Sequence, residues 1–183
     1  AAAKIYPEHK ALQKLDDQIK FGQCITVIIG TRVRPHSRAY ILEVPRRESE
    51  VVCFMFLEHN KTPDAAPAGH GLIMMYLEGQ VSERLMDTSD EEIVAKTMPF
   101  IEGIMPEVMG SVDMAHVTRW KAALPINAIG AYQAVGEFNK AQESDTNIQF
   151  GCDYMMAAVG QSIAVECGNR SSANLIRVLR APL

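Results

Sequence analysis

The hydrophobic pattern in the first half of the chain predicts one short helix followed by strands. In residues 8–20, Leu12, Leu15 and Ile19 recur at helical spacing with charged residues between them, which is typical of an amphipathic helix. Runs rich in apolar and β-branched residues follow, and such runs favour strands. We therefore expect strands over residues 24–29, 39–44, 50–57 and 71–77, with loops at 45–48 and 61–69.

The second half of the chain predicts mainly helices. Ser89 and the three acidic residues after it form a helix start, because a serine side chain can accept hydrogen bonds from the first backbone N–H groups. Apolar residues then form one stripe as far as Met105, while Pro99 is expected to kink this helix and Pro106 to end it. Beyond it we expect a strand over 112–120, a loop over 125–130, a helix over 131–141, a polar turn over 143–147, a strand over 148–150 and a helix over 161–179.

The order of these elements defines the expected fold class. Strands predominate early, and the helices do not alternate strictly with them. We therefore predict an α+β fold, with a mostly antiparallel mixed sheet that is covered by helices on one side. The sequence contains no internal repeat and no low-complexity run.

Composition narrows the class of protein and its partners. With 183 residues, 48% of them hydrophobic and 22% charged, the chain can build a core as one domain, or as one domain plus a segment of another. Its net charge of −4 argues against nucleic acid as a main partner, since phosphate binding needs a basic stripe. No run reaches the roughly 18 apolar residues of a membrane-spanning helix, so we expect no membrane span.

The positions of cysteine and histidine argue against a metal site. Cys24, Cys53, Cys152 and Cys167 lie far apart and form no C-x-x-C pair, and no two histidines have the helical spacing of metal ligands. A free cysteine in apolar surroundings usually behaves as a small hydrophobic residue. We therefore expect no metal, and a reducing compartment, the cytoplasm.

The C-terminal residues carry the strongest chemical signal. Residues 150–153 read FGCD, residues 155–160 read MMAAVG, and the helix expected over 161–179 follows directly. This order predicts a buried strand, a tight turn that ends in Asp153, and a helix that opens on small residues. The start of such a helix offers unpaired backbone N–H groups and a positive dipole end to an electron-rich ligand.

Several short stretches also resemble a known family, in the right order along the chain. They are residues 21–27 (FGQCITV), 66–72 (APAGHGL), 89–106, 118–125 (TRWKAALP), 150–153 (FGCD) and 164–168 (AVECG). Together they are similar to the substrate-binding domain and last flavin-contacting segment of the FAD-dependent amine oxidase, phytoene desaturase and protoporphyrinogen oxidase superfamily. Desaturase-like members fit better than true amine oxidases. The resemblance implies a substrate-binding-like domain over 1–146, and over 147–183 a flavin-contacting strand and helix that would belong to an incomplete FAD domain.

The resemblance implies FAD as the cofactor and assigns four residues to it. Asp153 would reach the ribityl or phosphate region, and the alternative for this aspartate is a plain turn or helix cap. The backbone N–H groups near Val159, Gly160 and Gln161 would face the pyrimidine edge of the flavin and stabilise its negative charge on reduction. Gly168 would let the last helix pack closely against its neighbour.

The resemblance assigns three further residues to a substrate pocket, and none as catalytic. Trp120 and Tyr132 would lie near the flavin and the substrate. Thr26 occupies the position where many amine oxidases carry a lysine close to flavin N5, and a neutral hydroxyl cannot replace an ammonium group, which argues against amine oxidation by that arrangement. Cys152 stands where glycine usually precedes the aspartate, so the turn reaches positive φ less freely. Arg119, beside Trp120, could anchor an acidic substrate group or have a structural role, as a salt bridge or a cation–π contact.

One part of a complete FAD site is missing from the sequence, namely the G-x-G-x-x-G turn that holds the pyrophosphate. We therefore expect FAD to bind only together with a Rossmann half, carried by an N-terminal extension or by a partner chain. Three explanations of the missing half are open: the chain is a fragment, a proteolytic product, or one subunit whose partner carries that half. We prefer the first. The implied reaction is hydride transfer from a C–H bond of a small apolar or mixed substrate to flavin N5. The alternative is a stand-alone, non-catalytic binding or dimerisation domain, which an exposed apolar face and a homodimer would support.

Overall fold

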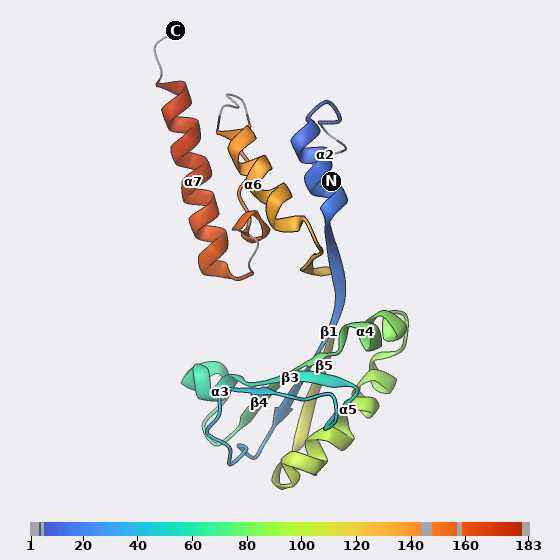
Figure 1. Cartoon of the computed structure of the whole chain (residues 1–183). Coiled ribbons are helices and arrows are strands. Elements are labelled where there is room, and N and C mark those ends of the chain that lie inside the picture. The colour runs from blue at the N-terminus through green and yellow to red at the C-terminus, as the bar shows by residue number, and fades with distance from the viewer. Residues whose placement is uncertain (1–3, 5, 144–147, 157–158, 181–183) are drawn as a thin grey trace. The chain divides into compact units, whose positions relative to one another are not determined.

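The computed structural model describes residues 4, 6–143, 148–156 and 159–180 (Figure 1). The chain forms two compact units, of which one combines residues 1–22 with 124–183 and the other comprises residues 23–123. The division into a substrate-binding-like region over 1–146 and a flavin-contacting segment over 147–183 stays a prediction. Each unit has its own hydrophobic core.

A five-stranded antiparallel open sheet gives the fold its class and confirms the predicted α+β architecture. The strands are β1 (Ile19–Thr31), β2 (Ile41–Glu43), β3 (Val52–Leu57), β4 (Gly71–Leu77) and β5 (Val112–Asn127). Their order in the sheet is β2-β3-β4-β1-β5. β4 lies in the middle and pairs antiparallel with β3 on one side and with β1 on the other, where Ile29 opposes Ile73.

Helices α4 (Gly79–Leu85) and α5 (Asp90–Ile104) pack their apolar sides on this sheet (Figure 1). Along β4, Ile73 and Met75 are buried while Met74 and Tyr76 are half-buried, which is the period-two pattern of a strand with one face on the core. The helices contribute to the same core with Val81, Ile93, Ile101 and Met105. Burying each such side chain stabilises the fold by about 1.5–3 kcal/mol.

The start of α5 confirms the predicted helix cap. The Ser89 hydroxyl accepts a hydrogen bond from the Glu92 N–H at 3.3 Å, and the acidic first turn complements the helix dipole. The helix continues through Pro99. Arg119 of β5 pairs with Asp90 at 2.6 Å, so this arginine has the structural salt bridge that was one of its two expected roles.

Three other helices belong to the unit that combines residues 1–22 with 124–183 (Figure 1). They are α2 (Lys10–Gln18), α6 (Ala131–Gln142) and α7 (Gln161–Leu179). Their core comprises Leu12, Leu15, Ile19, Ala134, Val135, Phe138, Met155 and Cys167. Phe138 is fully buried there, with the rings of His9 and Phe150 at 5.5 and 5.6 Å from its own. These helices therefore bury apolar faces in a core of their own, distinct from the one that α4 and α5 share with the sheet.

Several boundaries differ from the sequence prediction because strand length depends on pairing. β1 begins at Ile19 instead of residue 24, and β5 continues to Asn127 through part of the predicted loop 125–130. α4 was not predicted, since seven residues give little periodic signal. Short turns complete the chain: α3 (Glu58–Lys61), η1 (Pro63–Ala65), η2 (Pro106–Val108) and η3 (Asp153–Met156).

The predicted strand over residues 148–150 is wrong, because these residues form no strand. A strand requires a neighbour that pairs with its backbone. At Phe150 the backbone N–H and C=O bond instead to the side chains of Gln142 and Ser171. The apolar run is real, but within the described residues it lies among helices and not beside another strand.

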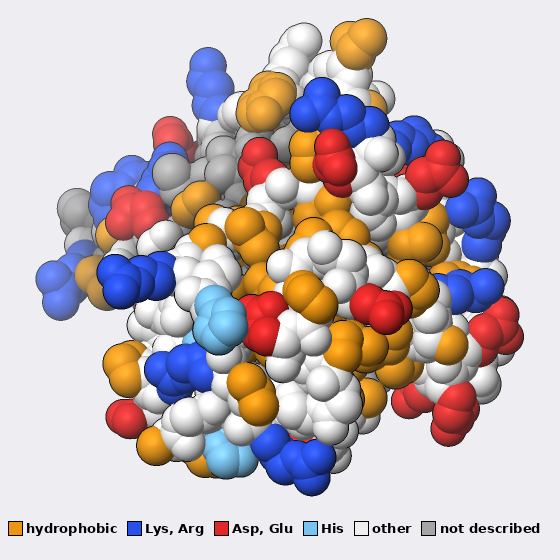
Figure 2. Space-filling model, turned by 90° about the horizontal axis from the view of Figure 1, so that it is seen from below, with side chains coloured by type: hydrophobic (Ala, Val, Ile, Leu, Met, Phe, Trp, Pro, Cys, Tyr) orange, Lys and Arg blue, Asp and Glu red, His pale blue; other side chains and the backbone are white. Residues whose placement is uncertain are grey.

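The surface mixes charges of both signs. On the face shown in Figure 2, Lys and Arg side chains are interspersed with Asp and Glu, and hydrophobic side chains are exposed between them. No single-sign patch dominates this face. None of the helices in the described parts of the chain combines the length and the hydrophobicity that a membrane crossing requires.

His59 of α3 is buried with one ring nitrogen unpaired. The Leu72 N–H donates to its Nδ1 at 3.0 Å, so the neutral ring carries its proton on Nε2, which has no hydrogen-bond partner among the described residues. Burial lowers the pKa of His59 below its ordinary value of 6.5, and the positive charge of Arg34 lowers this pKa further. The folded protein therefore holds this imidazole neutral.

We expect the free energy of unfolding to fall as the pH drops below 6.5, because the unfolded chain then binds a proton at His59 that the folded chain does not bind. His59→Gln should make this decline shallower, since the amide does not titrate. Urea unfolding at several pH values between about 7 and 5 measures the slope. His116→Gln, a change at an exposed histidine, is the control, and a slope in His59→Gln equal to that of the wild type would contradict the prediction.

Candidate functional site

The loop that leads into α7 is closed by one carboxylate. Asp153 Oδ1 accepts a hydrogen bond from the Tyr154 N–H at 2.9 Å, and Oδ2 accepts one from the Gly160 N–H at 3.2 Å. The two bonds join the beginning of the loop to its end. Asp153 is half-buried, so its bond with the Tyr154 N–H competes less with water than it would at an open surface, whereas its bond with the Gly160 N–H is exposed.

The start of α7 is an exposed helix end without a side-chain cap. Gly160 occupies the N-cap position with φ of 139°, a conformation that favours glycine, and it has no side chain to cap the helix. Val159, Gly160 and Gln161 are all exposed. The first backbone N–H groups of a helix have no partner within the helix, and the dipole is positive there. An electron-rich group can approach this end directly.

The backbone before this loop is held by side chains of two helices. Gln142 Oε1 of α6 accepts a hydrogen bond from the Phe150 N–H at 3.0 Å, and the Ser171 hydroxyl of α7 donates to the Phe150 C=O at 2.7 Å. Gly151 lies so close to α7 that a Cβ there would come within 3.1 Å of the Cys167 carbonyl oxygen. The segment is thus fixed against α7 immediately before Asp153.

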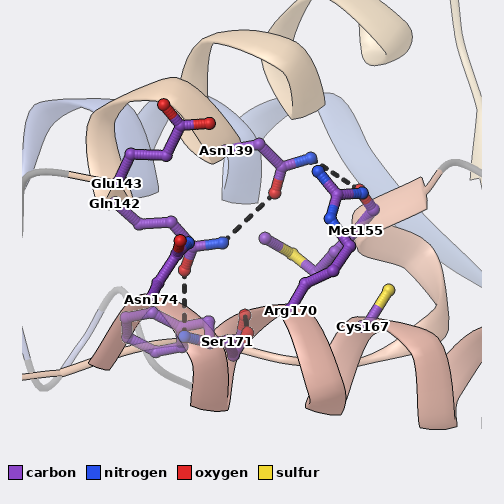
Figure 3. A pocket seen from close by; sticks show the side chains of 9 residues that line it. Asn139, Gln142, Glu143, Met155, Cys167, Arg170, Ser171 and Asn174 are labelled. Carbon is purple, nitrogen blue, oxygen red and sulfur yellow. Dashed lines mark hydrogen bonds between the residues drawn. The ribbon is translucent and has the colours of Figure 1, made fainter. Parts of the chain in front are cut away.

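A small polar cavity lies beside these contacts, between α6 and α7 (Figure 3). Its volume is about 20 Å³, which is room for one water molecule. The lining residues are Asn139, Gln142, Glu143, Phe150, Met155, Cys167, Arg170, Ser171 and Asn174. The Asn139 amide donates to the Met155 C=O at 2.7 Å, and Arg170 extends from α7 toward α6 in Figure 3. The cavity is too small for an organic ligand.

The thiols and the phenol around the loop stay protonated at neutral pH. Burial raises the pKa of the Cys152 thiol and, more strongly, the pKa of the Tyr154 phenol. Burial likewise raises the pKa of Cys167. The Tyr154 ring contacts that of Phe21 edge to face at 5.9 Å, as expected for a packing residue. None of these groups is activated as a nucleophile or base.

The predicted site residues divide between the two units. Asp153, Val159, Gly160 and Gln161 lie together around the start of α7, and Tyr132, 66% exposed, belongs to the same unit on α6. In the sheet unit, Trp120 on β5 is 51% exposed, whereas Thr26 is 4% exposed inside β1, opposite Tyr76 of β4. The structure therefore brings together the four residues assigned to the cofactor.

Sequence reasoning missed the residues that support this loop. Ser171, Gln142 and Asn139 belong to no motif in the sequence. Their hydrogen-bond partners are backbone groups of Phe150 and Met155, and no spacing in the sequence predicts such contacts. The one signal in the sequence was the apolar residue Phe150 after a polar turn. It indicated a buried segment, and the backbone N–H and C=O groups of a buried segment need hydrogen-bond partners.

Comparison with known proteins identifies the family. The family of flavin-containing amine oxidoreductases matches residues 2–176, and the chain therefore belongs to this family. Over 86 residues, 47% of this chain, it is 30% identical to coproporphyrinogen III oxidase of Bacillus subtilis, of which the match covers 18%.

Solved structures show the same fold at low identity. A protein assigned as a protoporphyrinogen oxidase from Exiguobacterium sp. 255-15 matches 90% of this chain with a TM-score of 0.67 and 14% identity. Wild-type putrescine oxidase bound to putrescine matches 92% with a TM-score of 0.61 and 16% identity. The chain spans only 36% and 38% of the lengths of these two proteins.

We expect Gln142→Met to destabilise the helical unit by about 1–3 kcal/mol, because it leaves the half-buried Phe150 N–H without the acceptor that the buried Gln142 side chain provides. Methionine and glutamine have similar helix propensity, so the change isolates the hydrogen bonds. Urea unfolding measures the difference. The matched control is Gln133→Met on the exposed side of α6, which should change stability by less than about 0.5 kcal/mol. Equal effects of the two changes would disprove the role of Gln142.

Proposed function

We propose that the chain supplies the substrate-binding-like region and the flavin-facing segment of an FAD-dependent oxidoreductase. The observation that carries this proposal is the exposed, uncapped start of α7, which follows a loop closed by Asp153. Such an end attracts electron-rich groups through its N–H groups and its dipole. Membership of the flavin-containing family supports the flavin as that group.

The residues of this segment fit one edge of a flavin. The Gly160 N–H already donates to Asp153 Oδ2, so the N–H groups of Val159 and Gln161 on either side of it would donate hydrogen bonds to the pyrimidine edge and stabilise the charge that develops there on reduction. Asp153 acts on them through the backbone, since its carboxylate binds the Gly160 N–H. It would then set the position of the helix start in addition to contacting the ribityl or phosphate region.

A Rossmann half, on an N-terminal extension or a partner chain, would hold the rest of the cofactor. The sequence has no G-x-G-x-x-G turn, and the solved relatives are more than twice as long as this chain. When bound, FAD supplies a ring that accepts a hydride from a substrate C–H bond. This chain's contribution is to orient that ring, to exclude water and to stabilise charge.

The substrate would be small and apolar or mixed, and the aromatic side chains of Trp120 and Tyr132 would line its pocket. Each of these residues exposes more than half of its surface, which leaves its ring free to contact a ligand or another protein segment. Thr26 offers no ammonium group, which favours C–H oxidation of the desaturase kind over amine oxidation. The reducing, cytoplasmic compartment inferred from the cysteines stays a prediction.

A second candidate function is a non-catalytic binding or dimerisation domain. It is favoured by the outer face of α7, where Val165, Ile176 and Leu179 are exposed. An apolar helix face of this kind is typical of an interaction surface.

The visible absorption spectrum separates the two candidates. We expect the purified chain with excess FAD to show no bands of bound flavin, because the phosphate cradle is absent, and we expect those bands once a Rossmann half is joined to it or co-purified with it. A joined protein that folds and still binds no flavin would disprove the oxidoreductase proposal. Flavin retained by this chain alone would disprove the requirement for a second half.

In the flavin-binding form, we expect Asp153→Ala to weaken FAD binding about tenfold, which corresponds to about 1.4 kcal/mol. The physical reason is the loss of the carboxylate that holds the Tyr154 and Gly160 N–H groups. Flavin fluorescence titration measures the affinity. Asp17→Ala, which removes an exposed carboxylate from α2, should leave the affinity unchanged. Equal affinities of Asp153→Ala and wild type would overturn the assignment of Asp153.

A further inference from the structure

A groove opens at one edge of the sheet, between β2 and the end of α5. Its volume is about 320 Å³. Small-molecule sites in proteins are mostly apolar and have volumes of roughly 300–1,000 Å³, so this groove has the size of such a site. All of its lining residues belong to the unit of residues 23–123. We call it the edge groove, and its apolar lining comprises Leu42, Val44, Pro45, Phe100, Ile104 and Met105.

The edge groove lies on the opposite face of the sheet from Thr26. Leu42 opposes Met55 of β3, and Met55 opposes the buried Met75 of β4, so all three side chains lie on the face that α4 and α5 cover. Thr26 opposes Tyr76, which is the neighbour of Met75 in β4 and therefore lies on the other face. The edge groove is thus separate from the substrate pocket that Thr26 would line.

The polar side chains of the edge groove favour a cation. Among the described residues that line it there is no lysine, arginine or histidine, and Glu48 contributes a carboxylate. The Glu43 side chain leaves β2 on the other face, because it alternates with Leu42 and Val44. Glu48 Oε1 accepts a hydrogen bond from Arg47 Nε at 3.1 Å at an exposed position. A carboxylate has two oxygens and can accept further hydrogen bonds from a ligand.

The end of α5 adds negative potential at the same place. The helix ends at Ile104, and both Ile104 and Met105 line the edge groove. The last C=O groups of a helix have no partner within the helix, and the dipole is negative there. The last turn of α5 contains no basic residue that would offset this charge. A positive ligand group at this end is therefore stabilised twice, by the helix and by Glu48.

The edge strand β2 is unsuited to pairing with a further strand. It is three residues long, and Pro45, Arg46 and Arg47 follow it closely. Short edge strands, prolines and charged side chains are features that prevent an exposed sheet edge from pairing with another strand. A protein segment that filled the groove by extending the sheet is therefore disfavoured. A small molecule needs no such pairing, because the apolar lining supplies the contact.

We propose that the edge groove binds a small hydrophobic cation, namely an amine with an apolar body. The body would pack on the apolar lining, and the ammonium group would lie between the Glu48 carboxylate and the end of α5. Such a site is additional to the proposed substrate pocket, since it lies on the other face of the sheet. The proposal does not rest on flavin binding, and its test uses no flavin signal.

Three probes with the same apolar body test the charge preference. Phenylbutylamine, phenylbutanol and phenylbutyrate carry a positive, a neutral and a negative head group at neutral pH. We expect the amine to bind with a dissociation constant of about 0.1–1 mM, as a ligand of this size can. It should bind about threefold to tenfold more tightly than the alcohol, and the acid more weakly than the alcohol. NMR titration measures the constants, and the methyl shifts should centre on Leu42, Val44, Ile104 and Met105.

Two pairs of variants test the contacts. Ile104→Trp should weaken amine binding about tenfold, because the larger side chain takes up the space of the ligand. Ile41→Trp is its matched control, since these isoleucines are 45% and 44% exposed and Ile41 lies on the other face of β2 from Leu42. Glu48→Gln should remove most of the advantage of the amine over the alcohol. Glu50→Gln, at an exposed glutamate outside the groove, should leave this advantage unchanged.

Three results would overturn the proposal, and all of them can be read on the wild type if a variant fails to fold. One is equal affinity for the amine and the alcohol. Another is a set of shifts centred on Thr26 and Met74, which would place the amine on the other face of the sheet. The third is no binding of any of the three probes to the folded chain, as expected if the edge groove is a contact surface for another protein segment.

Discussion

The arrangement around α7 depends on how one half-buried backbone unit, that of Phe150, satisfies its hydrogen bonds. Phe150 lies in an apolar run that has no strand beside it in the described residues, and a buried N–H or C=O without a partner is costly. Gln142 and Ser171 supply the two bonds that a neighbouring strand would have supplied. Because they come from α6 and α7, the same contacts join both helices to the segment. The position of Asp153, two residues after Gly151, follows from this attachment.

From that position, the Asp153 carboxylate holds the backbone at the start of α7. The sequence left two roles open for this aspartate, a cofactor contact or a turn or helix cap, and the structure gives its carboxylate bonds to Tyr154 and Gly160 that close the turn before α7. The two roles are compatible, since a loop held from inside presents its outer N–H groups without reorganisation. The proposed flavin contact is therefore made by a preorganised backbone, and the carboxylate acts largely through it.

The outer face of α7 adds a constraint of another kind. A helix with apolar residues on two sides can bury only one of these sides within a three-helix unit. The other side must face solvent, another part of the protein or a second molecule. The proposed flavin-facing end and the exposed residues Val165, Ile176 and Leu179 occupy different parts of the same helix. A Rossmann half and a second copy would compete if both needed these three residues, so the oligomeric state bears on the choice between the two candidate functions.

The sequence by itself determined the elements whose signals are local. The bounds of β4 and α7 and the Ser89 cap follow the prediction, since period, capping chemistry and breakers act within a few residues. The tertiary structure decided how far β1 and β5 extend, because strand length depends on partners that are distant in the chain. It also decided that residues 148–150 are not a strand, and that Gln142 and Ser171 support Asp153. These contacts join positions separated by 8 and 21 residues, and no local pattern encodes them.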